Sequence, residues 1–154
     1  MLKRAAQIRA GKDIVAKELD NLRCSVAWGV TGSSAEVERS MEAYPFVAHA
    51  RNSEGDLVGY VSAFSDGVFT TMLGELLVHP DYQRRGIGSA LLKQVEQRYP
   101  GIPVEVRCSG EQLAFFLRRG FLSRGRRVQL VSKMSDARNE SVIAWTAGSL
   151  RADY

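Results

Sequence analysis

The stretch LLVHPDYQRRGIGSALL, from Leu76 to Leu92, decides how the rest of this sequence is interpreted. Its apolar start, Leu76 to Val78, predicts a strand, and the apolar spacing from Ile87 onward predicts an amphipathic helix. A basic turn with two glycines joins the two elements. The first amides of a helix lack partners and carry partial positive charge, so this turn could bind a phosphate or a pyrophosphate.

The turn has features of an anion-binding loop. Gly86 and Gly88 would let the backbone approach an anion closely, and Arg84 and Arg85 would add positive charge. The alternative is an ordinary strand-to-helix turn with solvated arginines, because a bare Gly-x-Gly is a weak signal. Two better-known phosphate loops do not fit. Leu91 stands where a dinucleotide fingerprint needs its third glycine, and no Gly-Lys-Ser/Thr triplet follows the turn.

The same turn carries a longer motif, Val78-His79-Pro80-Asp81-Tyr82-Gln83-Arg84-Arg85-Gly86-Ile87-Gly88. It resembles, with no position missing, the Val-x-Pro-x-x-Gln/Arg-x-x-Gly-x-Gly/Ala signature of the GNAT N-acetyltransferase superfamily. The resemblance implies that acetyl-CoA is the cosubstrate, with its pyrophosphate on the loop amides and its pantetheine arm along the strand backbone. The implied cofactor-binding residues are Leu76, Leu77, Val78, Gln83, Arg84, Arg85, Gly86, Ile87, Gly88 and Ser89, with Phe116 from a later helix.

Length and composition indicate an ordinary globular protein. The chain has 154 residues, of which 45 % are hydrophobic and 25 % charged, and this suits one domain. No apolar run approaches the ~20 residues that a membrane-spanning helix needs. The first ten residues lack the apolar core and cleavage site of a signal peptide. We therefore expect a cytoplasmic protein that makes no membrane contact.

The net charge and the cysteine positions limit the classes of ligand that the protein is expected to bind. The net charge is +4, with arginines crowded into the last third, and this favours anionic ligands such as CoA or nucleic acid. Nucleic acid has weak support, because stacking aromatics and known binding motifs are absent. Cys24 and Cys108 are far apart and lack zinc-ligand spacing, so we expect reduced thiols and no metal.

Pattern and resemblance together predict a mixed α/β fold: a central, mostly antiparallel sheet flanked by helices, in the GNAT order. The resemblance covers residues 26 to 134. We expect one acetyltransferase domain over residues 1–134 and a tail, 135–154, that packs on the domain or mediates the dimers common in the family. The predicted strands are an opening one from residue 2 to 8, with its main part at 7–9, and then 46–51, 57–64, 68–78, 102–108 and 121–134. The predicted helices are 13–26 with Asp13 as its cap, 34–41, 87–99 and 111–119.

The first two helices lie where GNAT proteins place the wall of the acceptor site. The resemblance therefore implies that Trp28, Met41 and Tyr44 bind the substrate, although ordinary core or rim positions explain them equally well. Such an apolar wall favours an arylalkylamine or another small primary amine. A protein N-terminus or lysine is an alternative acceptor. An aminoglycoside is a further alternative acceptor, because the second predicted helix has three acidic residues: Glu36, Glu38 and Glu42.

Acetyl transfer to an amine needs a proton acceptor and a donor to the tetrahedral oxyanion. Glu75 is the best candidate for the acceptor, as an unpaired carboxylate in an apolar strand that burial would make more basic. A solvent-facing glutamate is the alternative. For the oxyanion, the resemblance implies the backbone N–H of Val78. That amide is free only if its strand splays from the strand at 102–108.

The leaving thiolate is where the sequence departs from the family. The family often has a tyrosine donor four residues before Gly-Phe, but here Phe116 precedes Gly120-Phe121 at that spacing. Ser109 replaces the usual asparagine at the start of this helix and is the first candidate donor, followed by Cys108, Ser123 and Tyr82. A lost general acid could cost about 10²–10⁴ in rate. We expect direct transfer in a ternary complex, with a non-catalytic acyl-CoA sensor as the alternative.

Overall fold

A computed structural model gives the fold, and it describes residues 6–28, 32–108 and 110–123. The chain divides into two compact units, Met1–Val106 and Arg107–Tyr154. The first unit contains the sheet and three of the helices. The second contains the remaining described helix, α4 (Gly110–Leu117).

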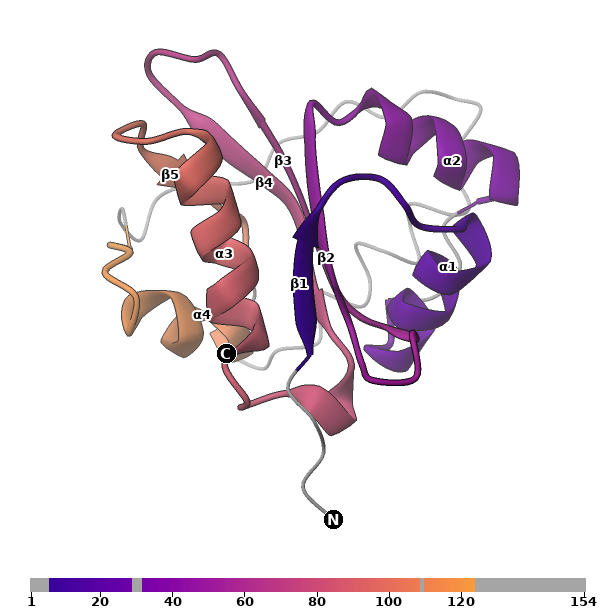
Figure 1. The fold of residues 1–154 in the computed structure, drawn as a ribbon. Helices are drawn as coiled ribbons and strands as arrows, with labels where there is room; N and C mark the ends of the chain where they lie inside the picture. The colour runs from indigo at the N-terminus through magenta and orange to yellow at the C-terminus, as the bar shows by residue number, and fades with distance from the viewer. Residues whose placement is uncertain (1–5, 29–31, 109, 124–154) are drawn as a thin grey trace. The chain divides into compact units, whose positions relative to one another are not determined.

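The sheet has five strands in the order β1-β2-β3-β4-β5 (Figure 1). The first four pair antiparallel, and β5 runs parallel to β4. This confirms the predicted mixed sheet. The strands are β1 (Gln7–Ala10), β2 (Phe46–Arg51), β3 (Leu57–Ser65), β4 (Thr71–Val78) and β5 (Val104–Glu105).

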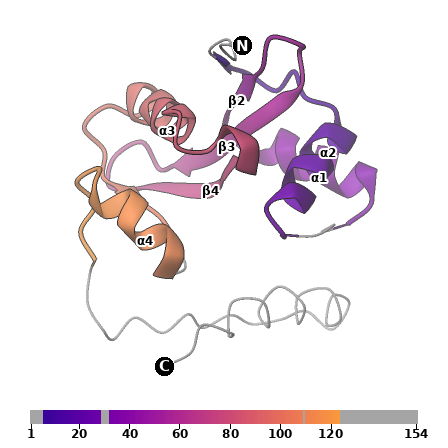
Figure 2. The ribbon, with the colours of Figure 1, turned by 90° about the horizontal axis from the view of Figure 1, so that it is seen from below.

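Helices cover both faces of this sheet. Figures 1 and 2 show α1 (Ala16–Ser25) and α2 (Ser34–Ala43) on one face and α3 (Ile87–Arg98) on the other. A short 3₁₀ turn, η1 (Pro80–Tyr82), precedes α3. Within the described residues, none of the helices combines the length and the apolar character that crossing a membrane requires.

Close packing against β3 sets the position of α3. A Cβ atom added to Gly59 would lie 3.0 Å from both Ile87 Cγ2 and Leu91 Cδ1. Real Cβ atoms rarely come this close to another heavy atom, so only glycine lets the first turns of α3 lie so near the strand. The glycine thereby helps to fix where the basic turn is held.

The start of α1 differs from the prediction. The helix begins at Ala16 with Val15 as its N-cap, so the prediction of Asp13 as the cap was wrong. The Glu18 carboxylate instead accepts a hydrogen bond from the Val15 N–H, at 3.0 Å. A residue inside the first turn thus satisfies one of the amides that a capping side chain would have satisfied.

Two strands are shorter than predicted. β4 begins at Thr71 rather than at residue 68, because the Asp66 carboxylate accepts hydrogen bonds from the N–H groups of Val68, Phe69 and Thr70 and closes a turn. β5 has two residues instead of the predicted 102–108. Residues 121–123 form no strand, and the rest of the predicted strand 121–134 and the tail 135–154 lie outside the described residues.

Candidate functional site

The turn before α3 has the geometry of an anion-binding loop. Gly86 is the N-cap in the left-handed region, at φ +81°, and Arg84 adopts φ +58°. Gly86 has no side chain to cap the helix, and the first turn of α3 contains no acidic residue. The positive end of the helix dipole is therefore uncompensated at the position where we predicted a pyrophosphate.

Side-chain contacts fix the shape of this loop. Gln83 Nε2 donates to the Val78 carbonyl at 3.0 Å, and the Asp81 N–H donates to His79 Nδ1 at 3.2 Å. The Arg85 guanidinium lies 5.2 Å from the Tyr82 ring centre. Gln83 and His79 therefore hold the turn in place, and the Arg84 and Arg85 side chains are exposed beside it.

The amide of Val78 faces an open strand edge. Val78 pairs with Gly59 of β3, and the next amide, of His79, donates to the Val58 carbonyl at 2.9 Å. Successive amides along a strand point to opposite sides, so the Val78 N–H points away from β3. Among the described residues, β5 pairs with β4 only at Thr71 and Met72. The role of the Val78 amide as oxyanion donor stays a prediction, with which this pairing is compatible.

A β-bulge interrupts β4 close to this edge. The register shifts between Ser62 and Ala63 of β3, which leaves Gly74 as the extra residue of β4. The Tyr44 ring lies over it: a Cβ added to Gly74 would be 2.3 Å from the Tyr44 hydroxyl oxygen. The bulge therefore brings Tyr44, a predicted substrate-binding residue, next to Glu75.

Glu75 is paired, which corrects the prediction of an unpaired carboxylate. Arg23 Nη2 lies 2.6 Å from Glu75 Oε1, and Arg23 Nε donates to Oε2 at 3.4 Å. A second carboxylate, Asp20, lies one turn earlier in α1 and 3.7 Å from Arg23 Nη1. The guanidinium thus lies between two acidic groups beneath α1.

A buried tyrosine completes this cluster. Tyr60 of β3 is 1 % exposed, and its pKa is raised, chiefly by burial and then by the negative charge of Glu75. The Ser62 hydroxyl on the same strand accepts a hydrogen bond from the Glu75 N–H at 3.1 Å. Tyr60 therefore stays protonated beside the carboxylate.

The sequence analysis overlooked Arg23 and Tyr60. Arg23 lies four residues after Leu19 and one after Leu22, so it falls on the apolar face of α1. A charged residue on such a face needs a buried partner. The place of Arg23 on the apolar face was therefore the sequence signal that could have identified it. That place does not identify its partner.

The predicted acceptor residues share one hydrophobic core. Met41 is 4 % exposed and belongs to that core, and Trp28 and Tyr44 are partly buried against it. Tyr44 also lines a shallow hollow of about 290 Å³, together with Ser40, Ala43, Pro45 and Phe64.

The second unit contains the remaining predicted residues. Phe116 is buried and packs edge-on against Phe115 and Phe121, with ring centres 5.0 Å and 5.2 Å away. Burial raises the pKa of the Cys108 thiol, which disfavours its thiolate. Ser109 lies outside the described residues. In the ranges that the structure describes, no three His, Cys, Asp or Glu side chains gather as metal ligands.

Comparison with known proteins gives a family match and partial relatives. The model of the acetyltransferase (GNAT) family matches residues 16–121. Mycothiol acetyltransferase of Kineococcus radiotolerans is 43 % identical over 63 residues, which cover 40 % of this chain and 21 % of that protein. Peptidyl-lysine N-acetyltransferase YiaC of Escherichia coli is 36 % identical over 81 residues, 49 % of this chain and 53 % of that protein. The matched stretches thus span about half or less of these relatives.

Solved structures agree on the fold. A GNAT-family acetyltransferase from Streptococcus pneumoniae superimposes with a TM-score of 0.70 at 20 % identity, covering 84 % of this chain and 100 % of that one. At this identity the likeness concerns the fold alone. The β4 splay and the uncapped start of α3 therefore lie in an architecture that other acetyltransferases share.

Proposed function

The chain belongs to the GNAT acetyltransferase family, and from this premise we propose that it transfers the acetyl group of acetyl-CoA to a primary amine. One observation carries the proposal. The single strand β4 has a carboxylate, Glu75, beside its bulge and ends at Val78, whose amide points away from β3, and the basic turn then leads to the start of α3, where Gly86 provides no side-chain cap. An anion site and a proton acceptor are thus held at a fixed separation.

The residues of β4 support a direct transfer. Glu75 accepts a proton from the acceptor ammonium, and the neutral amine attacks the thioester carbonyl, whose developing oxyanion the Val78 N–H stabilises. The C–N bond forms and the C–S bond breaks. The second amine proton goes to the departing thiolate, and Glu75 later releases its own proton to water. A thiol pKa of about 8–9 lets the thiolate leave without the tyrosine that Phe116 replaces.

The hollow beside Tyr44 favours an acceptor with an apolar arm. Its aromatic and small side chains would accept the ring of an arylalkylamine, with the amine directed toward Glu75. A lysine side chain is the second candidate, because it also has an apolar arm and a terminal amine. The similarity to a peptidyl-lysine acetyltransferase supports that candidate.

Release of free CoA thiol from acetyl-CoA tests the proposal. The panel contains arylalkylamines, lysine-containing peptides, polyamines and aminoglycosides. We expect release that depends on the amine and is fastest for amines with an apolar arm. Acetyl-CoA binding without release across the whole panel would contradict the enzyme and favour the acyl-CoA sensor.

A matched pair of glycine variants tests the anion site. Gly86→Asp should abolish CoA binding in calorimetry, because the carboxylate would repel the pyrophosphate. Gly101→Asp is the control: Gly101 also has positive φ, +74° against +81°, and neither glycine has a heavy atom within 4 Å of an added Cβ. Backbone strain is therefore similar in both variants. Equal CoA affinity in the two would contradict the assignment of the loop.

A further inference from the structure

We propose that Arg23 is a positioning residue for the transfer: its guanidinium holds the Glu75 carboxylate in the orientation in which it can accept the proton of the acceptor ammonium. This inference rests on the proposed function, because it assigns Glu75 the role of proton acceptor. It concerns a residue of α1 that reaches β4 across 52 positions of sequence.

The contact geometry supports an orienting role. Two nitrogens of Arg23 meet the two oxygens of Glu75, at 2.6 Å and 3.4 Å. A guanidinium that contacts both oxygens fixes the plane of the carboxylate as well as its place. The Arg23 side chain is 5 % exposed and that of Glu75 16 %, so little water competes for either group.

The charge of the cluster supports a cationic acceptor. One guanidinium lies between two carboxylates, and Asp20 Oδ1, 3.7 Å from Arg23, has no hydrogen-bond partner in the described part of the chain. Tyr60 of β3 adds no charge, because burial and the negative charge of Glu75 raise its pKa. By formal charge, one guanidinium against two carboxylates, the cluster is negative, which favours a protonated amine.

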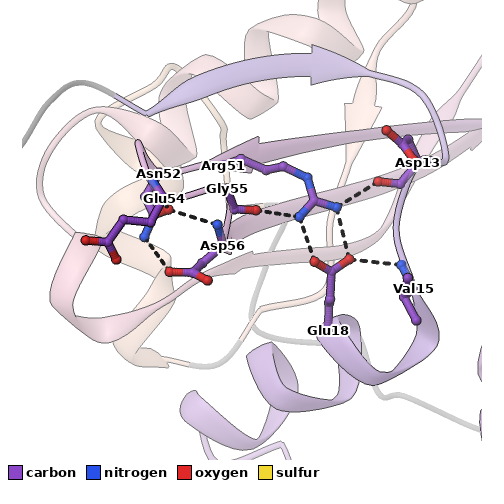
Figure 3. A network of polar contacts seen from close by, with 8 residues as sticks. All are labelled: Asp13, Val15, Glu18, Arg51, Asn52, Glu54, Gly55 and Asp56. Atoms are coloured by element: carbon purple, nitrogen blue, oxygen red, sulfur yellow. Dashed lines mark hydrogen bonds and ion pairs between the residues drawn. The ribbon is translucent and has the colours of Figure 1, made fainter.

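A second arginine, paired with a glutamate of the same helix, offers a matched control. Arg51 of β2 contacts both oxygens of Glu18 in the first turn of α1, at 2.7 Å and 2.9 Å (Figure 3). This pair has the same chemistry as Arg23 and Glu75, but its partners are the Asp13 and Gly55 carbonyls rather than β4. Substituting Arg51 therefore removes an α1 ion pair without touching Glu75.

The test compares kcat and KM at one pH for the wild type and for Arg23→Lys, Arg23→Gln and Arg51→Gln. Without the guanidinium, the carboxylate loses the contacts that fix its plane, so kcat of Arg23→Gln should fall by about tenfold or more. Arg23→Lys should lose less because it keeps a charged donor. Arg51→Gln should keep the wild-type kcat, and calorimetry should give one CoA affinity for all four proteins. A wild-type kcat in Arg23→Gln would overturn the proposal.

A readout independent of turnover separates this proposal from the proposed function. The carboxyl signal of Glu75 at pH 7 can be followed by carbon NMR on protein with labelled glutamate, with Glu75→Gln identifying the signal. Its chemical shift should change in Arg23→Gln and stay in place in Arg51→Gln. A changed shift in a protein that acetylates no amine would refute the function alone, whereas an unchanged shift would refute the role of Arg23.

Discussion

Two ion pairs join α1 to the sheet, and they differ in their surroundings rather than in their length. Arg51 and Glu18 meet at 2.7 Å at the start of the helix, and Arg23 and Glu75 meet at 2.6 Å near its end. The outer side chains are 22 % and 32 % exposed, and the inner ones 5 % and 16 %. Water can take over the outer contacts when they break, but it reaches the inner ones poorly.

The pairs also differ in how completely their charges are satisfied. The Arg51 guanidinium has both Glu18 oxygens and two backbone carbonyls as partners, and the adjoining turn is closed by Asn52 (Figure 3). The inner cluster contains a second carboxylate, Asp20, with an oxygen that has no hydrogen-bond partner among the described residues. The charges of the outer pair are therefore more completely satisfied than those of the inner cluster.

Breaking the inner pair should have the largest effect. Arg23→Met leaves two carboxylates buried without their cation, and we expect it to lower the free energy of unfolding by about 3–5 kcal/mol. Urea unfolding at pH 7 measures this loss. Adding Glu75→Gln to Arg23→Met should recover part of it, because one uncompensated charge is removed. A loss below about 1 kcal/mol would mean that the inner pair stabilises the fold no more than a surface ion pair does.

Gly74→Ala should have an intermediate effect, because it changes packing but no charge at the inner site. An added Cβ would lie 2.3 Å from the Tyr44 hydroxyl oxygen and 2.5 Å from two ring carbons, so the ring must move. Such overpacking costs about 1–3 kcal/mol. Thermal unfolding measures it, and Tyr44→Leu is the background in which the loss should largely disappear. An equal loss there would mean that Tyr44 is not the obstacle.

The sequence predicted what local patterns determine. The strand that ends at Val78, the basic turn and the helix from Ile87 are consecutive, and their apolar spacing and glycines sufficed to predict them. The pairing of Arg23 with Glu75 was beyond such reasoning, because it joins residues 52 positions apart. A helical face shows that a buried arginine needs a partner, whereas only the folded sheet determines which carboxylate is opposite.

Predictions failed where two local signals competed. Asp13 is a good capping residue by type, but Glu18 inside the first turn satisfies the Val15 amide instead. Val68 and Phe69 have strand-forming side chains, yet the Asp66 carboxylate binds their amides in a turn. Met41 is a different case: it is 4 % exposed, and its role in substrate binding stays a prediction.

The outer pair should show the smallest effect, and one that depends on pH. Arg51→Met should lower the free energy of unfolding by about 1 kcal/mol at pH 7, because the side chains of Arg51 and Glu18 are partly exposed. The hydrogen bond from Arg51 is the largest cause that holds the pKa of Glu18 below its ordinary value of 4.5. A carboxyl with a lowered folded-state pKa stabilises the protein above its unfolded pKa. That stabilisation is lost as the pH falls through the folded value.

The difference in stability between wild type and Arg51→Met should therefore shrink as the pH falls below about 4.5. His49 titrates in a neighbouring range: burial lowers its pKa from 6.5, so stability should already fall as the pH drops below 6.5. That loss occurs in both proteins but is smaller in Arg51→Met, because the Arg51 charge is one of the causes that lower the His49 pKa. Glu18→Gln separates the two effects, because this variant keeps both His49 and Arg51 and lacks the outer carboxylate. Urea unfolding midpoints of wild type, Arg51→Met and Glu18→Gln at pH 7, 5 and 3 measure these differences. A difference that stays constant down to pH 3 would mean that Arg51 stabilises the protein through its two backbone carbonyls and not through Glu18.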